Sequence, residues 1–232
     1  MDGGTVVVFG ATGGTGRLTM ERLLATTRFN VVGAVRRPDA LAGFAPEHAA
    51  SGRFRAVACD LMDPGPGDAR LIAALDGAAA AVFAAGVADV WAARRGTTLY
   101  SEGGGALLRA MRAAGVRVLV AVTSDGVLDD PAKPAVYRWL VKPLLLRRVY
   151  EDMVALEQAI AAASPWLKWA IVRPSRLLDA PPAGAAARQP WIGEGLMPPG
   201  SGGWVARGDV AALIVACLEG QARWGRALTI TC

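Results

Sequence analysis

A chain of 232 residues that is 53% hydrophobic and 19% charged is long enough to bury one substantial core and too apolar to be intrinsically disordered. The formal net charge of +5 comes from scattered basic residues without a nucleic-acid-binding motif, so we expect no nucleic-acid partner. The longest nearly uncharged run, residues 75–91, contains two aspartates and is too weak for a membrane span, so we expect no membrane partner either.

Cysteine and histidine usage indicates the cellular compartment and limits the kinds of functional site. Three widely spaced cysteines favour reduced thiols, and no basic segment precedes an apolar leader, so we expect a cytoplasmic protein. The single histidine, His48, lies in a polar stretch, which argues against a histidine-based zinc site or a Ser-His-Asp triad. We therefore expect no metal.

Short β-branched runs alternate with helical stretches along the chain, a pattern typical of a parallel sheet covered by helices. The predicted strands cover residues 5–9, 30–35, 54–59, 79–85, 116–123, 168–172 and 227–231. The predicted helices cover 16–25, 69–75, 100–114, 135–163 and 209–218, with a break expected at Lys142-Pro143 because proline removes a backbone donor. Residues 181–203 are rich in proline and glycine and predict a loop or a short-strand excursion.

These elements predict an α/β protein with a Rossmann-like, doubly wound parallel sheet in three αβα layers. Residues 1–232 form a single domain in this interpretation, and a small substrate-pocket region comes from about 131–150 and 175–206.

A glycine-rich turn follows the first predicted strand and precedes the first helix. Gly10, Gly13 and Gly16 have the spacing of a dinucleotide-binding turn, in which backbone N–H groups and the helix N-terminus face the pyrophosphate. The whole turn is predicted to bind cofactor, namely Gly10, Ala11, Thr12, Gly13, Gly14, Thr15 and Gly16.

The residues at the end of the second predicted strand indicate which dinucleotide the chain binds. An NAD-preferring site carries an acidic residue there, whereas this chain has Arg36 and Arg37, whose guanidinium groups suit a 2′-phosphate. The predicted cofactor is therefore NADP(H). Asp60 and Leu61 follow the third strand, where the carboxylate could accept from the adenine amino group or cap the next turn. The small residues Ala84, Ala85 and Gly86 would let the cofactor lie across the sheet edge.

Taken together, these motifs resemble the NmrA-like branch of the atypical short-chain dehydrogenase/reductases, and within it the biliverdin-IXβ reductase/flavin reductase group. The resemblance spans nearly the whole chain and rests on residues 6–17, 35–41, 59–61, 100–116, 122–133, 171–177 and 207–214. It implies hydride transfer from NADPH to a flat, conjugated acceptor such as a flavin, quinone or linear tetrapyrrole.

The resemblance also implies roles for individual residues. Ser124 matches a serine beside the nicotinamide, with Thr123 before it, and Pro174-Ser175 lies where the group closes over the nicotinamide end. Arg176 is a candidate for an anionic substrate group. Trp91, Trp139 and Trp191 could wall an aromatic pocket, although tryptophan is more often core packing.

One departure concerns the Tyr-x-x-x-Lys pair that most short-chain dehydrogenases use for proton transfer. The candidates here, Tyr137 and Lys142, are one residue too far apart. On the helix ending in Glu157, the tyrosine and lysine positions hold Val149 and Met153, with Tyr150 one residue off. The leading hypothesis is an NADPH-dependent reductase that acts on a small-molecule substrate as a monomer or homodimer. A non-catalytic redox sensor, and an isomerase, epimerase or cyclase of secondary metabolism, are the alternatives.

Overall fold

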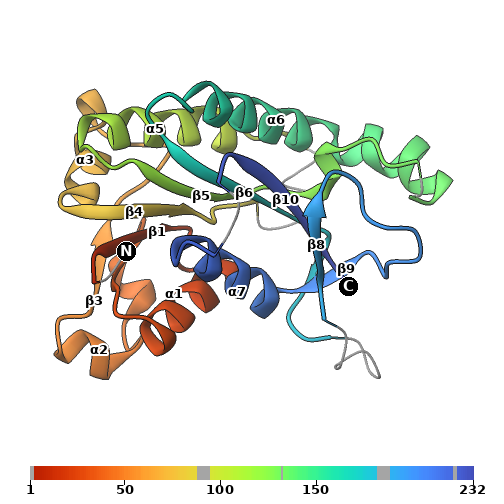
Figure 1. Cartoon of the computed structure of the whole chain (residues 1–232). Coiled ribbons are helices and arrows are strands. Elements are labelled where there is room, and N and C mark those ends of the chain that lie inside the picture. The colour runs from red at the N-terminus through yellow and green to blue at the C-terminus, as the bar shows by residue number, and fades with distance from the viewer. Residues whose placement is uncertain (1–2, 88–94, 132, 182–188, 222–223) are drawn as a thin grey trace.

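The computed structural model describes residues 3–87, 95–131, 133–181, 189–221 and 224–232, and within them an eight-stranded sheet crosses the molecule (Figure 1). The strand order is β3-β2-β1-β4-β5-β6-β10-β8, parallel throughout except for the antiparallel pairing of β8 with β10. A small parallel pair, β7-β9, lies outside it. The strands are β1 (Thr5–Phe9), β2 (Asn30–Val35), β3 (Phe54–Ala58), β4 (Ala78–Phe83), β5 (Val118–Val122), β6 (Lys168–Pro174), β7 (Arg176–Leu178), β8 (Trp191–Glu194), β9 (Trp204–Ala206) and β10 (Arg226–Thr231).

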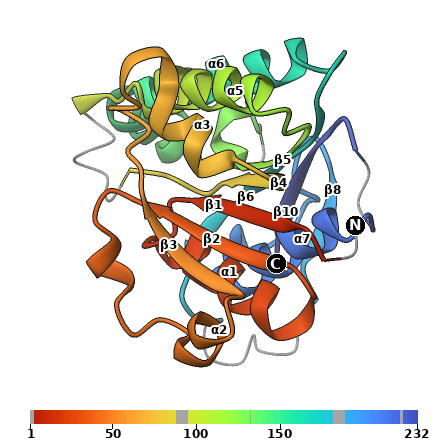
Figure 2. The same ribbon diagram turned by 90° about the vertical axis from the view of Figure 1, so that its left-hand side faces the viewer.

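Helices cover both faces of this sheet (Figures 1 and 2). One layer holds α1 (Gly14–Thr26), α2 (Pro46–Ala50) and α7 (Arg207–Leu218), and the other holds α3 (Ala69–Leu75), α5 (Gly104–Ala113) and α6 (Arg147–Ala162). Short 3-10 turns cover Pro38–Leu41, Pro66–Asp68 and Asp125–Val127, and π-helical segments cover Leu99–Gly103 and Tyr137–Leu146. The predicted doubly wound αβα fold is thus confirmed.

Side chains along each buried strand point alternately to the two faces of the sheet, which explains why a helix layer covers each face. Val6 and Val8 of β1 pack into the core beneath α1 and α7, while Val7 and Phe9 pack into the core beneath α3 and α5. Successive strand residues point to opposite faces, and a parallel sheet buried on both sides therefore needs an unbroken apolar run such as TVVVF. Burying each such side chain contributes about 1.5–3 kcal/mol relative to leaving it exposed.

The strand order reverses between β1 and β4, and this point positions the functional site. From β1 the chain moves outward through β2 and β3, then returns to place β4 on the other side of β1. Ligands of open α/β sheets bind outside the carboxyl ends of the strands at such a switch point. Gly10 follows β1 and Ala84 follows β4, so the glycine turn lies there.

Among the predicted boundaries that differ from the structure, two lie near the site. Helix α1 begins at Gly14, inside the glycine turn, and not at Gly16. The predicted break at Lys142-Pro143 is wrong, because Pro143 lies inside the π-helix Tyr137–Leu146, which joins α6 directly at Arg147. The excursion predicted over 181–203 does contain a short strand, β8. No helix among the described residues is long and apolar enough to cross a bilayer.

Candidate cofactor site and active-site cavity

The glycine turn packs so closely that side chains have no room at two of its positions. Gly10 has φ +79°, and a Cβ on it would lie 2.5 Å from the backbone nitrogen of Ala85. A Cβ on Gly16 would lie 2.3 Å from the carbonyl oxygen of Gly10. Because the obstructing atoms are backbone, neither clash could be relieved by a rotamer change. The turn is therefore held against β4 in a shape that only glycine permits.

The N-terminus of α1 points out of this turn with its backbone donors available. Gly13 is the N-cap, no side chain caps the helix, and its first turn contains no acidic residue. The first amides of a helix have no partner within the helix, and the helix dipole places partial positive charge there. The turn therefore fits a pyrophosphate: its close packing leaves the backbone exposed, and its amides form a ready anion site.

Arg207, the first residue of α7, lies against the same turn and was missed by the sequence reasoning. A Cβ on Gly14 would lie 2.7 Å from Cδ of Arg207, so this side chain crosses the helix N-terminus in close contact with the glycine. The guanidinium forms an ion pair with the exposed carboxylate of Asp179. The structure thus brings a cation to the predicted phosphate site from the opposite end of the chain.

Three other groups of predicted cofactor residues lie around this turn. Arg36 and Arg37 are exposed directly after β2. Oδ1 of Asp60 accepts from the backbone N–H of Met62 at 3.0 Å, so this carboxylate caps the turn after β3. Residues 84–86 line the edge of a cavity, together with Thr15.

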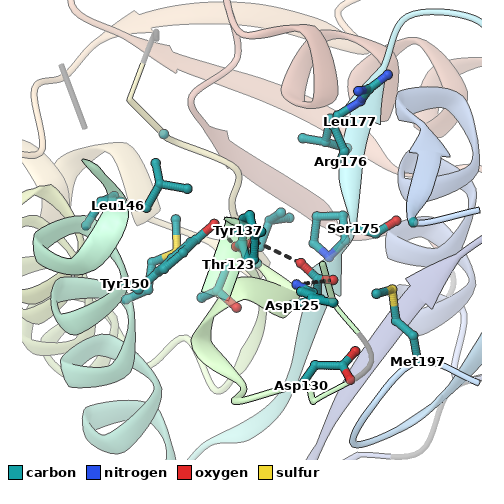
Figure 3. Close-up of a pocket in the computed structure, with 18 of the residues that line it drawn as sticks. Thr123, Asp125, Asp130, Tyr137, Leu146, Tyr150, Ser175, Arg176, Leu177 and Met197 are labelled. Carbon is teal, nitrogen blue, oxygen red and sulfur yellow. Dashed lines mark hydrogen bonds and ion pairs between the residues drawn. The ribbon is translucent and has the colours of Figure 1, made fainter. Parts of the chain in front are cut away.

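That cavity, of about 950 Å³, opens at the carboxyl ends of β4, β5 and β6 (Figure 3). Figure 3 shows Leu146 and Tyr150 on one side, and Arg176, Leu177 and Met197 on the other. Ser124, Pro174 and Ser175 line it as well, and residues 197–203 contribute to its wall. The predicted pocket regions, 131–150 and 175–206, therefore both contribute to one cavity.

Two tyrosines meet in this cavity. The hydroxyl groups of Tyr137 and Tyr150 are 3.0 Å apart, and a Cβ on Gly126 would lie 2.1 Å from Cζ of Tyr150. Burial chiefly raises the pKa of Tyr150, although hydrogen bonds with Tyr137 and Ser124 oppose the rise. Burial and the neighbouring phenol raise the pKa of Tyr137 as well. Both phenols therefore stay protonated through neutral pH.

A buried ion pair lies next to the tyrosines. Nζ of Lys133 is 2.9 Å from Oδ2 of Asp125 and 5.0 Å from the ring centre of Tyr137. Burial raises the pKa of Asp125 despite this lysine, because the carboxylate loses more hydration than the ion pair returns. Ser124 precedes it, and its Oγ accepts from the backbone N–H of Gly126 at 3.1 Å.

Lys142, the predicted partner of Tyr137, is engaged elsewhere. Its Nζ donates to the carbonyl of Leu128 at 2.8 Å and to Oδ1 of Asp129 at 2.7 Å. It lies 5.9 Å from the ring centre of Tyr150 and is not among the described residues that line the large cavity. The structure therefore brings Tyr137 together with Tyr150, and not in a hydrogen-bonded pair with Lys142.

A buried network supports the floor of the cavity. The hydroxyl of Thr123 donates to Oε1 of Glu157 at 2.6 Å, and Nε of Arg173 donates to the same oxygen at 3.0 Å. Oγ of Ser175 donates to Oγ1 of Thr231 at 3.1 Å. These contacts tie β5, α6, β6 and β10 together beneath Ser124.

The residues predicted to bind substrate lie in different parts of the structure. Arg176 lines the cavity. Trp139 is 75% exposed on the outer side of its helix, and Trp191 lies on β8 against Gly193, so neither is among the described residues of the cavity wall. Trp91 lies outside the described residues.

Sequence reasoning missed Asp125, Gly126, Lys133 and Arg207 as site residues and gave Tyr150 no role. The first three fall in the block 122–133 that carried part of the resemblance, so only the pairing of Asp125 with Lys133 lacked a signal. Arg207 begins the block 207–214, which also supported the resemblance, but nothing local indicates that this residue lies beside Gly14.

Comparison with known proteins agrees with this geometry. The model of the NAD(P)H-binding family matches residues 10–221. Among solved structures, a short-chain dehydrogenase/reductase of Veillonella parvula in complex with NADP has a TM-score of 0.73 at 14% identity, covering 98% of this chain and 94% of that one. A Streptococcus pneumoniae protein described as an NADH-flavin reductase has 0.69 at 17% identity, covering 99% of both chains. A Bacillus halodurans protein described as an NAD-dependent epimerase/dehydratase has 0.72 at 20% identity, covering 99% and 94%. Identities this low show the shared fold, and the family match shows that this chain belongs to the NAD(P)H-binding family.

Proposed function

We propose that the protein is an NADPH-dependent reductase that transfers a hydride to a small conjugated acceptor such as a flavin, quinone or linear tetrapyrrole. The observation that carries the proposal is the cavity beside the glycine turn, whose wall combines apolar side chains with Ser124, two protonated phenols and a few charged groups such as Arg176. An apolar cleft with few convergent polar groups suits a flat aromatic ligand. With its pyrophosphate held by the turn, the bound cofactor would supply the hydride from its reduced nicotinamide.

The chain's own groups would then orient the acceptor and supply the proton that accompanies the hydride. Reduction of a quinone to a hydroquinone consumes one hydride and one proton. We assign Ser124 to hold an acceptor oxygen, and Tyr150 to donate the proton to it. Tyr137, whose hydroxyl is 3.0 Å away, would return a proton to Tyr150 from solvent. This assignment replaces the tyrosine-lysine pair, since Lys142 is bound to Asp129.

The proposed preference for NADPH over NADH rests on Arg36 and Arg37. Exchange of Arg36→Asp together with Arg37→Ala should weaken NADPH binding far more than NADH binding in isothermal titration. Each lost charge-assisted contact with a 2′-phosphate costs about 1.5–3 kcal/mol. Arg112→Ala, an exposed arginine on α5 in the opposite helix layer, is the matched control and should leave both affinities unchanged. Equal losses for the two cofactors would contradict NADPH preference.

Turnover separates the reductase from its alternatives. Steady oxidation of NADPH in the presence of a flavin or quinone supports the reductase, and Tyr150→Phe should slow it without weakening NADPH binding. A redox sensor would bind NADP⁺ and NADPH with different affinities and show no turnover across the acceptor panel. An isomerase, epimerase or cyclase would yield a product of unchanged oxidation state.

A further inference from the structure

A helical arm, residues 136–148, extends from the molecule, and of its apolar side chains Leu146 packs against a hydrophobic core. Its central ten residues, Tyr137–Leu146, form the π-helix, and none of them is buried. Figure 1 shows the segment in green, extending away from the sheet at the right of the view. The sequence of this helix, YRWLVKPLLL, is nevertheless strongly apolar. So many exposed apolar side chains in one short segment indicate an interaction surface.

The exposed apolar side chains of the arm share one side. Val136, Trp139, Leu140 and Leu144 are 55–75% exposed, whereas the other exposed large hydrophobic residues of the described chain reach only 43–47%. Residues 136, 140 and 144 recur at intervals of four, with Trp139 adjacent, so they follow one face of a helix. The four most exposed large hydrophobic side chains thus form a single stripe.

Basic side chains flank this stripe. Residues 131–150 contain five basic and no acidic side chains. Lys133, Lys142 and Arg147 pair with acids outside this stretch. The guanidinium of Arg138 lies 5.7 Å from the ring centre of Trp139, and Arg148 donates to a backbone carbonyl. The arm therefore presents tryptophan and leucine next to arginine.

We propose that the arm docks on an anionic lipid surface, with its apolar stripe at the level of the headgroups. Interfacial helices combine a tryptophan- and leucine-containing face with flanking lysine and arginine, and each basic group adds attraction to anionic lipids. A second copy of the chain fits less well. A twofold interface places the same surface of each copy against the other, so the basic side chains of the two arms would lie close together and repel one another.

The position of the arm links this surface to the cavity. Tyr137 and Leu146 lie on the arm and also line the cavity, so lipid contact would bring the cavity entrance close to the bilayer. This consequence rests on the proposed reductase function, and it specifies an acceptor dissolved in the membrane, such as a long-chain quinone. The sequence argument against a membrane partner concerned spanning segments, and a peripheral contact needs none.

Vesicle flotation of the full chain tests the docking itself. We expect the protein to float with vesicles of phosphatidylcholine and phosphatidylglycerol and to remain below with phosphatidylcholine alone. Raising the salt from about 0.1 M to 1 M should weaken binding several-fold, because the Debye length falls from about 10 Å to 3 Å. Trp139→Ser combined with Leu144→Ser should weaken it on the order of tenfold or more.

The control is Ile192→Ser, which removes an exposed hydrophobic side chain on β8, away from the arm, and should leave flotation unchanged. Thermal unfolding checks that each variant is folded. No flotation of the folded wild-type protein, or equal flotation of the double variant, would overturn the proposal. So would a dimer in light scattering that the double variant abolishes while vesicles still fail to bind.

Turnover with two quinones distinguishes failure of this inference from failure of the reductase proposal. The double variant should lose rate with a long-chain quinone in anionic vesicles and keep its rate with a water-soluble quinone. If neither quinone is reduced by the wild-type protein, the reductase proposal fails while flotation still decides the docking.

Discussion

Replacing Gly126 by alanine tests whether the position of Tyr150 matters to the chemistry. Gly126 does not have a positive φ, so alanine suits its backbone, but the new Cβ would lie 2.1 Å from Cζ of Tyr150 and 2.4 Å from its hydroxyl oxygen. An ordinary carbon–carbon contact is about 3.5–4.0 Å, so the ring must retreat by about 1.5 Å. Such a shift removes the 3.0 Å contact with Tyr137.

The expected consequence is a large loss of rate with a small loss of stability. Misplacement of a reacting group by about 1 Å can cost on the order of 100-fold in rate, whereas one lost hydrogen bond costs about 0.5–1.5 kcal/mol. We therefore expect kcat for NADPH oxidation to fall about 100-fold, with NADPH affinity unchanged.

Gly105→Ala provides the matched control. A Cβ there meets a single side-chain nitrogen of Arg109 at 3.7 Å, and the site lies on α5. This change should leave kcat unaltered and stabilise the helix by up to about 1 kcal/mol. If Gly126→Ala retained the full kcat in the steady-state assay, the assignment of Tyr150 as proton donor would be refuted.

Three further predictions follow from other contacts. Arg207→Gln should weaken NADPH and NADH equally in calorimetric titration, because the pyrophosphate is common to both; a selective loss for NADPH would contradict this placement. Glu157→Gln should lower the free energy of unfolding in urea by about 1.5–3 kcal/mol, because the partly buried Arg173 loses its charge-assisted contact with the carboxylate; a change below about 0.5 kcal/mol would show that the network is dispensable. Burial raises the pKa of all three tyrosines, so the stability they provide is complete below about pH 10 and is lost as the pH rises through the raised values. Tyrosinate absorbance should therefore appear together with alkaline unfolding, and a phenol that titrates near pH 10 in the folded protein would contradict this.

Local sequence signals were sufficient for the fold and for the glycine turn. TVVVF followed by Gly10 specifies a buried strand that ends in a tight turn, and the structure places it at the reversal of strand order. The same local reasoning misplaced the break at Pro143, since a π-helix accommodates that proline. Helix boundaries of this kind depend on packing that periodicity does not encode.

Tertiary contacts, across a single loop or between distant elements, explain what sequence reasoning missed at the site. Lys133 pairs with Asp125 across a loop, and Arg207 crosses Gly14 although almost two hundred residues separate them. The candidate pair Tyr137 and Lys142 was one residue too far apart for the family's spacing, and the fold instead pairs Tyr137 with Tyr150 from α6. Such partnerships arise only when elements from different parts of the chain pack around one cavity.

Hydride transfer itself is the most direct test of the reductase proposal. NADPH carrying deuterium at the transferable position is mixed with excess protein and a flavin or quinone under anaerobic conditions, and the reduced acceptor and NADP⁺ are followed together. We predict that both form at the same rate, more slowly than with unlabelled NADPH. Tight NADPH binding without formation of NADP⁺ for any acceptor would contradict the proposal.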